Sequence, residues 1–378
     1  MIKIPLKFQP VSGLRIVIKL GTSTLTAGTN RLSLPRMIDL VRQMAQLHHS
    51  GCEVILVTSG AMAVGRERLG FPNLPKDIPA KQMLAAIGQP RLMALYEQLF
   101  GLYDLMVAQV LLTRNDLGVR RSYLNSRNTL IALLGQRVLP VINENDTVAT
   151  EEIRVGDNDN LSALVASLIE ADLLILLTDQ PGLFTADPRR EPDAQLIGEV
   201  VSPEIPAEIW RAAGGTSNGL GTGGMVTKLQ AANLARRSGV KVVIARGGDE
   251  DVILRVVSGE VIGTRFLPLS TPVEGRKRFI LAGGRTFGAV MIDQGALEAL
   301  HHGSSLLPVG VIGLEGSFER GDTVSVIGEQ GREVARGLVN YSSSELERIC
   351  GKHSEEIVGI LGFAYGDEVI HRNNMVLL

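Results

Sequence analysis

The segment KLGTSTLT, residues 19–26, places a lysine near the end of an apolar run and follows it with Gly-Thr-Ser. Such a lysine directs its ammonium group into the crevice beyond a strand's carboxyl end, where open α/β sheets bind ligands. Gly21 lets the backbone approach an anion, and the N–H groups after it can form a phosphate nest. Lys19 therefore marks a candidate phosphate site, although a Lys-Gly pair also occurs in ordinary turns.

A second glycine-rich segment, SNGLGTGGMVTKLQAA, covers residues 217–232 and leads directly into a helix predicted to start near Met225. The free N–H groups and the dipole of a helix N-terminus bind anions, and Lys228 lies in the first turns. The glycine spacing matches neither GxxxxGK[ST] nor GxGxxG. A flexible linker is the alternative, but linkers seldom continue into a helix with an apolar face.

Residues 141–163, VINENDTVATEEIRVGDNDNLSA, hold a dense acid and amide cluster on both sides of a predicted hairpin at 150–155. Its members are Asn143, Glu144, Asn145, Asp146, Asp157, Asn158, Asp159 and Asn160. Asp and Asn are ordinary cap and turn residues, but two such groups exceed what one helix cap requires. A carboxylate can bind the ammonium of an amino acid and an amide its carboxylate. Asp157 and Asp159 could alternatively hold a divalent cation.

The segment VTSGAMAVGRERLG, residues 57–70, ends a strand and opens a helix at the same edge of the predicted sheet. This second helix N-terminus suits a carboxylate. Ser59 as a catalytic nucleophile is the alternative, but its context, VTSGA, lacks the GxSxG pattern. The chain's histidines show no metal-binding spacing.

These segments are joined by an alternation of strands and helices. Apolar, β-branched strands are expected at 15–20, 54–60, 105–113, 138–143, 173–179 and 240–245. Helices are expected from Ser33 to Gly51 and over 80–100, 124–135, 160–170 and 222–238. This rhythm predicts a mostly parallel sheet with helices on both faces, a three-layer αβα sandwich.

After residue 269 the pattern changes. A polar connector, STPVEGRKR, precedes short strand-like runs broken by glycines, with helical pieces only at 295–302 and 342–350. We therefore expect two domains in the 378 residues, an α/β domain at 14–269 and a small, mainly β, barrel-like domain at 276–378.

Composition excludes several classes of partner. Net charge is −2 and aromatic residues make up 4%, so neither polyanion binding nor base stacking is indicated. No apolar run is long enough to predict a membrane span. Cys52 and Cys350 are far apart and lack CxxC spacing, which favours reduced thiols and a cytoplasmic protein. Residues 1–13 are expected to form a short tail or an edge strand.

Five segments, in this order, resemble the glutamate 5-kinase family of the amino acid kinase superfamily: KLGTS, VTSGAMAVGRERLG, PVINENDTVATEEIRVGDNDNLSAL, LLTDQPGLFTADPR and GLGTGGMVTKLQAA. The resemblance covers nearly the whole chain after Ser12. The tail from Arg276 to about His353 is similar to a PUA domain. The implied activity is ATP-dependent phosphorylation of the glutamate side-chain carboxylate, the first step of proline biosynthesis. The family also implies Mg²⁺, feedback inhibition by proline, a homo-oligomer (tetramer or dimer) and a reductase that receives the product.

The resemblance also implies roles for individual residues. Lys19 and Lys228 would contact the transferred phosphoryl group, and Asp159 would orient both lysines. Glutamate would be held by Ser59, Asp146 and Asn158. ATP would be bound by Lys19, Thr178, Asp179, Thr222, Gly223, Gly224, Met225, Val226, Thr227 and Lys228.

Two alternative functions remain open on the sequence alone. Another kinase of the superfamily would act on N-acetylglutamate, aspartate, carbamate or UMP, but the INEND and GDND motifs favour glutamate. An RNA-binding protein is the other, because PUA domains bind RNA elsewhere. Residues 276–378 carry ten basic and thirteen acidic residues, a local charge of −3, which disfavours binding to phosphates.

Overall fold

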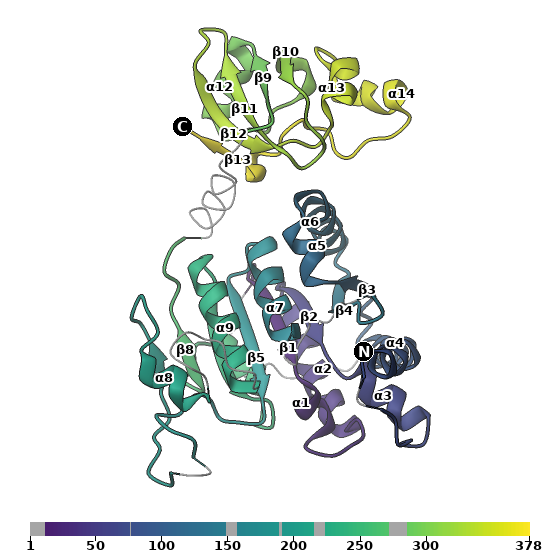
Figure 1. Cartoon of the computed structure of the whole chain (residues 1–378), viewed down its shortest axis with the longest axis vertical. Helices are drawn as coiled ribbons and strands as arrows, with labels where there is room; N and C mark the ends of the chain where they lie inside the picture. Colours follow the sequence, from purple (N-terminus) through teal and green to yellow (C-terminus); the bar gives the residue numbers. More distant parts are fainter. Residues whose placement is uncertain (1–11, 76, 149–156, 189–190, 215–223, 272–285) are drawn as a thin grey trace. The chain divides into compact units, whose positions relative to one another are not determined.

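The computed structural model describes residues 12–75, 77–148, 157–188, 191–214, 224–271 and 286–378 (Figure 1). The chain groups into two compact units. The first comprises residues 1–117 and 126–272, and the second comprises residues 118–125 and 273–378. The domain boundaries inferred from sequence, 14–269 and 276–378, stay a prediction.

The first unit is built on one eight-stranded sheet. In the order β3-β4-β2-β1-β5-β7-β8-β6, neighbouring strands are parallel except for the antiparallel pair β7–β8. The strands are β1 Arg15–Leu20, β2 Glu53–Thr58, β3 Val107–Leu112, β4 Leu139–Glu144, β5 Leu173–Thr178, β6 Glu199–Val200, β7 Lys241–Arg246 and β8 Thr264–Phe266. The central strands are buried along nearly their whole length, as expected for parallel strands covered on both faces. The predicted, mostly parallel sheet is thus confirmed.

Helices cover both faces of this sheet (Figure 1). On one face, Ile16 and Ile18 share a core with Met37 of α2 Leu34–His49 and Val252 of α10 Val252–Val257. On the other face, α7 Asp157–Leu168 and α9 Gly224–Arg237 pack on each other and against β1 and β7. These layers form the expected αβα sandwich. The remaining helices of the unit are α1 Thr22–Thr26, α3 Ala61–Arg68, α4 Ile78–Gly101, α5 Arg114–Gly118, α6 Arg120–Gly135 and α8 Ala207–Ala212, with α6 beginning among residues grouped with the second unit.

The acid and amide cluster differs from its predicted setting. Helix α7 begins at Asp157 rather than at Asn160, and β4 extends to Glu144. Asn143 and Glu144 therefore end β4 and residues 157–160 begin α7, whereas Asn145 and Asp146 lie in the turn after β4. Asp and Asn suit a first helical turn because the N–H groups there are unsatisfied and the dipole favours negative charge. The predicted hairpin at 150–155 and most of the N-terminal tail lie outside the described residues.

One other helix start differs from expectation, and one N-cap lacks its side-chain hydrogen bond. Helix α6 begins at Arg120 rather than at 124. Ser33 does occupy the N-cap of α2, but its side chain accepts no capping hydrogen bond.

The second unit contains a five-stranded sheet in the order β10-β9-β11-β12-β13, with β9 and β11 parallel and the other pairs antiparallel. The elements are β9 Gly288–Ile292, α12 Gln294–His301, β10 Val311–Gly316, β11 Thr323–Gly328, β12 Glu333–Leu338, α13 Ser343–Ile349, α14 Ile357–Leu361 and β13 Met375–Leu377. Ser342 and Glu345 form a capping box at the start of α13. The mainly β character expected for this region is confirmed.

Candidate active site

The site lies where the strand order of the large sheet reverses. From β1 the chain continues through β2 and β4 on one side, and β5 and β7 lie on the other. Open α/β sheets bind ligands beyond the carboxyl ends of strands at such a switch point. Lys19 is the last residue but one of β1, and Ser59 follows β2. Asn143 is near the end of β4, and Thr178 ends β5. One edge of the sheet thus collects residues that are widely separated in sequence.

Asp159 holds two lysines at this edge. Its Oδ1 lies 2.5 Å from Nζ of Lys19, and its Oδ2 lies 3.2 Å from Nζ of Lys228. Thr227 also donates its hydroxyl hydrogen to Oδ2, at 2.7 Å. All four side chains are buried. Because Asp159 is in the first turn of α7, helix packing between α7 and α9 brings Lys228 to the lysine of β1.

The charges in this cluster are strongly coupled. Burial by itself raises the pKa of Asp159, but Lys19 and Lys228 outweigh burial and hold that pKa below its usual value. Burial lowers the pKa of Lys19; Asp159 opposes this effect, whereas the like charge of Lys228 adds to it. An added anion would relieve the repulsion between the two ammonium groups. The cluster therefore favours a ligand with negative charge.

A chain of amides lies beside the lysine cluster. Asn158 donates from Nδ2 to Oγ of Ser59 and to Oδ1 of Asn143, both at 3.1 Å. Asn143 donates to Oε1 of Gln89 at 2.7 Å, and Gln89 donates to Oε1 of Gln109 at 2.8 Å. The predicted pair Ser59 and Asn158 is thus in direct contact. The structure adds Asn143 to this pair as a hydrogen-bond partner.

Asp146 lies in the turn after β4, where it lines a cavity of about 570 Å³. Gln89, Gln109 and Glu144 line the same cavity. Gln89 therefore faces both this cavity and the amide chain, and Asp146 is close to the acid and amide cluster predicted from sequence.

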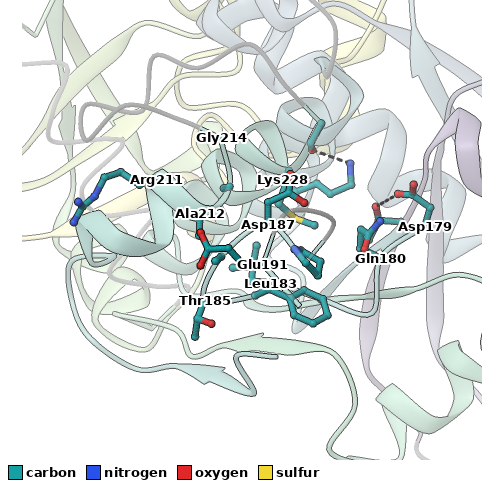
Figure 2. Close-up of a pocket in the computed structure, with 18 of the residues that line it drawn as sticks. Asp179, Gln180, Leu183, Thr185, Asp187, Glu191, Arg211, Ala212, Gly214 and Lys228 are labelled. Carbon is teal, nitrogen blue, oxygen red and sulfur yellow. Dashed lines mark hydrogen bonds between the residues drawn. The ribbon is translucent and has the colours of Figure 1, made fainter. Parts of the chain in front are cut away.

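On the β5 side, a cavity of about 950 Å³ reaches Lys228 (Figure 2). Its volume falls within the range of about 300–1,000 Å³ that small-molecule sites occupy. The residues that line it are Ser23, Thr178, Asp179, Gln180, Gly182, Leu183, Phe184, Thr185, Ala186, Asp187, Pro188, Glu191, Glu208, Arg211, Ala212, Ala213, Gly214, Gly224, Met225 and Lys228. Lys228 donates to the backbone oxygen of Gly224 at 3.1 Å, so its ammonium lies over the start of α9. The cavity thus joins a helix N-terminus to the lysine cluster.

The residues just before Lys228 face two different environments, the cavity and the protein core. Gly224 and Met225 line the cavity, whereas Val226 is fully buried and the hydroxyl of Thr227 turns to Asp159. A nucleotide-binding role of Val226 would thus be limited to its backbone. Thr222 and Gly223 lie outside the described residues.

Metal-ligand clusters and membrane-spanning helices were both sought in the described part of the chain. It contains no group of three or more His, Cys, Asp or Glu side chains arranged to hold a metal ion. The Asp157 side chain, half of the alternative cation site, is outside that part. None of the helices described is both long and apolar enough to cross a bilayer.

Comparison with known proteins shows the family to which this chain belongs. The amino acid kinase family profile matches residues 14–246. The glutamate 5-kinase of Shewanella amazonensis is 56% identical over 365 residues, which cover 96% of this chain and 96% of that protein. The chain belongs to the amino acid kinase family, in its glutamate 5-kinase branch. The glutamate 5-kinase of Deinococcus radiodurans is 53% identical over 366 residues, 97% of this chain and 100% of that protein.

Two further similarities complete the comparison. The PUA domain profile matches residues 288–361, as expected for the C-terminal region. A solved UMP kinase from Bacillus anthracis aligns with a TM-score of 0.47 at 15% identity, covering 68% of this chain and 96% of that chain.

Several residues at this candidate site are marked by no pattern in the sequence. Gln89 lies in the long helix α4 and Gln109 in an edge strand, and neither belongs to a polar cluster. Arg211 reaches the large cavity from the short helix α8, which no sequence motif marks, and Phe184 reaches it from the segment after β5. Asn143 and Phe184 stood in segments already singled out, Asn143 as the second residue of INEND and Phe184 within LLTDQPGLFTADPR.

Proposed function

We propose that this chain transfers the γ-phosphoryl group of ATP to the side-chain carboxylate of L-glutamate, which yields L-glutamyl 5-phosphate and ADP. This reaction would be the first step of proline biosynthesis. The observation that carries the proposal is the buried Lys19–Asp159–Lys228 cluster, with the nucleotide-sized cavity on one side and the Ser59–Asn158 pair on the other. The glutamate 5-kinases that share more than half of its residues support the choice of substrate.

The chemistry needs charge neutralisation rather than a general base. The side chain of free glutamate has a pKa of about 4.3, so its carboxylate is already a nucleophile at neutral pH. A carboxylate oxygen forms a bond to the γ-phosphorus while the bond from that phosphorus to the β–γ bridging oxygen breaks. Two anions must therefore approach each other in line. Lys19 and Lys228 would stabilise the negative charge on the transferred group, and Asp159 would fix both ammonium positions.

The two ligands would approach from opposite sides of the cluster. ATP would occupy the large cavity, with its phosphates at the start of α9 and beside Lys228. Thr178 and Asp179, which line this cavity at the end of β5, would contact the nucleotide. Glutamate would bind against Ser59, Asp146 and Asn158.

Mg²⁺ fits this site as a companion of the nucleotide. The ion usually takes most of its ligands from phosphates and water and only one or two from protein carboxylates. The nucleotide cavity is lined by the carboxylates of Asp179, Asp187 and Glu191, which would supply such ligands. When bound, the ion would withdraw negative charge from the phosphates.

The test is ATP consumption by the purified chain with and without glutamate, with hydroxylamine added to trap the acyl phosphate. Glutamate should stimulate ATP consumption and yield the hydroxamate, whereas N-acetylglutamate and aspartate should not. Stimulation by another carboxylate instead of glutamate would refute the proposed substrate.

Further proposals concern regulation and assembly. We propose proline as a feedback inhibitor, a homo-oligomer (tetramer or dimer), a cytoplasmic location and handover of the product to a reductase. Addition of proline to the ATP-consumption assay tests the first, because an inhibitor should suppress only the part that depends on glutamate.

A further inference from the structure

The amide chain from Gln109 to Ser59 has a fixed direction. An amide's oxygen and nitrogen are distinguished only by the partners that they meet. The backbone N–H of Glu144 can only donate, and it lies 2.9 Å from Oδ1 of Asn143. That oxygen must therefore be the acceptor, and Nδ2 of Asn143 must face Gln89.

The orientation of Asn143, fixed by this backbone donor, determines the orientations of the amides of Gln89 and Asn158. Gln89 has to present Oε1 to Asn143, at 2.7 Å, and its own Nε2 to Gln109. On the other side, Asn158 has to present Nδ2 to Oδ1 of Asn143. Reversal of any one amide would place two donors or two acceptors against each other.

The consequence at the substrate side concerns Asn158. Its Nδ2 is engaged by Asn143 and Ser59, while its Oδ1 is buried and has no hydrogen-bond partner among the described residues. A buried acceptor without a partner costs free energy unless a ligand satisfies it. Ser59 accepts from Asn158, which leaves its own hydroxyl hydrogen to donate. The pair thus presents an acceptor suited to an ammonium and a donor suited to a carboxylate.

We propose that Gln89 is a positioning residue for the amino-acid substrate: it accepts the hydrogen bond from Nδ2 of Asn143 and so keeps Asn143 in the orientation that the Glu144 N–H selects. Asn143 in turn keeps the carbonyl oxygen of Asn158 toward the substrate's ammonium group. This proposal rests on the proposed function. Gln89 itself does not touch Ser59 or Asn158, and no sequence motif includes it. Its role follows only from the acceptor that it supplies to a fully buried neighbour.

The test compares three variants with wild type. Gln89→Met keeps the size of the side chain but removes the acceptor, and Gln89→Glu keeps the acceptor. Gln98→Met is the matched control, because it makes the same substitution at an exposed position of the same helix, away from the amide chain. Gln89→Met should raise the KM for glutamate roughly 10-fold, the scale for one lost buried hydrogen-bond partner, with the KM for ATP unchanged. Gln89→Glu and Gln98→Met should stay near wild type.

A second readout separates positioning from a merely structural effect. Glutarate has both carboxylates of glutamate but no ammonium, so the ratio of kcat/KM for glutamate to that for glutarate reports recognition of the ammonium. Gln89→Met should lower this ratio. An unchanged ratio in a folded Gln89→Met protein would refute the proposal, as would equal losses toward glutamate and ATP. Wild type without glutamate-dependent turnover would instead refute the proposed function.

If Gln89→Met does not fold, Gln89→Glu decides the question. With the acceptor retained, its glutamate-to-glutarate ratio should match wild type, and a large fall in that ratio would contradict the proposed role.

Discussion

At the scale of single residues, the carboxylate of Asp159 allows two lysine ammonium groups to lie close together in a buried site. The carboxylate contacts one lysine with each oxygen, so the loss of either lysine leaves the other still paired. The variants Lys19→Ala and Lys228→Ala should therefore fold, and each should lower kcat by at least ~100-fold, the usual scale for losing one donor to the transition state. Steady-state kinetics measures this, with the exposed Lys352→Ala as the control. Near wild-type turnover in folded Lys228→Ala would refute the assigned role.

The same carboxylate controls the protonation of Lys19. Burial and Lys228 lower the pKa of Lys19, and the negative charge of Asp159 raises it. Removal of that charge in Asp159→Asn must lower the pKa further, so Lys19 should lose its proton at lower pH. We expect the alkaline limb of the kcat/KM profile to shift to lower pH in the variant. A limb that stays in place, or moves to higher pH, would show that Lys19 does not control it.

At the scale of helices and strands, two glycines determine how closely α3 lies against α4. A Cβ at Gly88 of α4 would lie 1.8 Å from the backbone oxygen of Ala61, and one at Gly65 of α3 would lie 2.0 Å from that of Leu84. Helix α3 begins directly after Ser59 and Gly60, and α4 carries Gln89. The close approach of these two helices thus supports Ser59 at one end of the amide chain and Gln89 within it.

Gly88→Ala should push the two helices apart. The expected loss is about 1–3 kcal/mol of unfolding free energy, the usual cost of overpacking a filled interface. Urea unfolding followed by circular dichroism measures it. Gly101→Ala, at the end of the same helix, is the matched control, since nothing lies within 4 Å of an added Cβ there. Equal stability of both variants would mean that the interface yields without cost.

At the scale of the whole molecule, the PUA region raises the question of RNA. Phosphate binding needs clustered positive charge, but residues 276–378 carry a local charge of −3. We expect the full chain to bind structured RNA weakly, without the steep loss of affinity that released counterions produce as salt rises. A gel-shift titration at several salt concentrations measures this. Tight, salt-sensitive binding would assign the region a role in RNA recognition.

The sequence by itself determined the αβα class, the mainly β region and the family. These features depend on local signals: apolar periodicity sets strands and helices, and the glycine motifs around Lys19 and Lys228 are contiguous in the chain. Ser59, Asn158 and Asp159 were predicted to serve one site, and the structure places Ser59 against Asn158, while their roles stay predictions. Their motifs end strands or begin helices, and a parallel sheet gathers such ends at one edge.

Only the tertiary structure decided which of these groups touch. Asp159 meets Lys19 because β1 lies centrally in the sheet, between β2 and β5, and it meets Lys228 because α7 packs against α9. Gln89 reaches Asn143, 54 residues away, through a contact that no local pattern predicts. The polarity of the amides was equally hidden, since it depends on where one backbone N–H of β4 points. Contacts of this kind follow from strand order and helix packing, which short-range sequence signals do not specify.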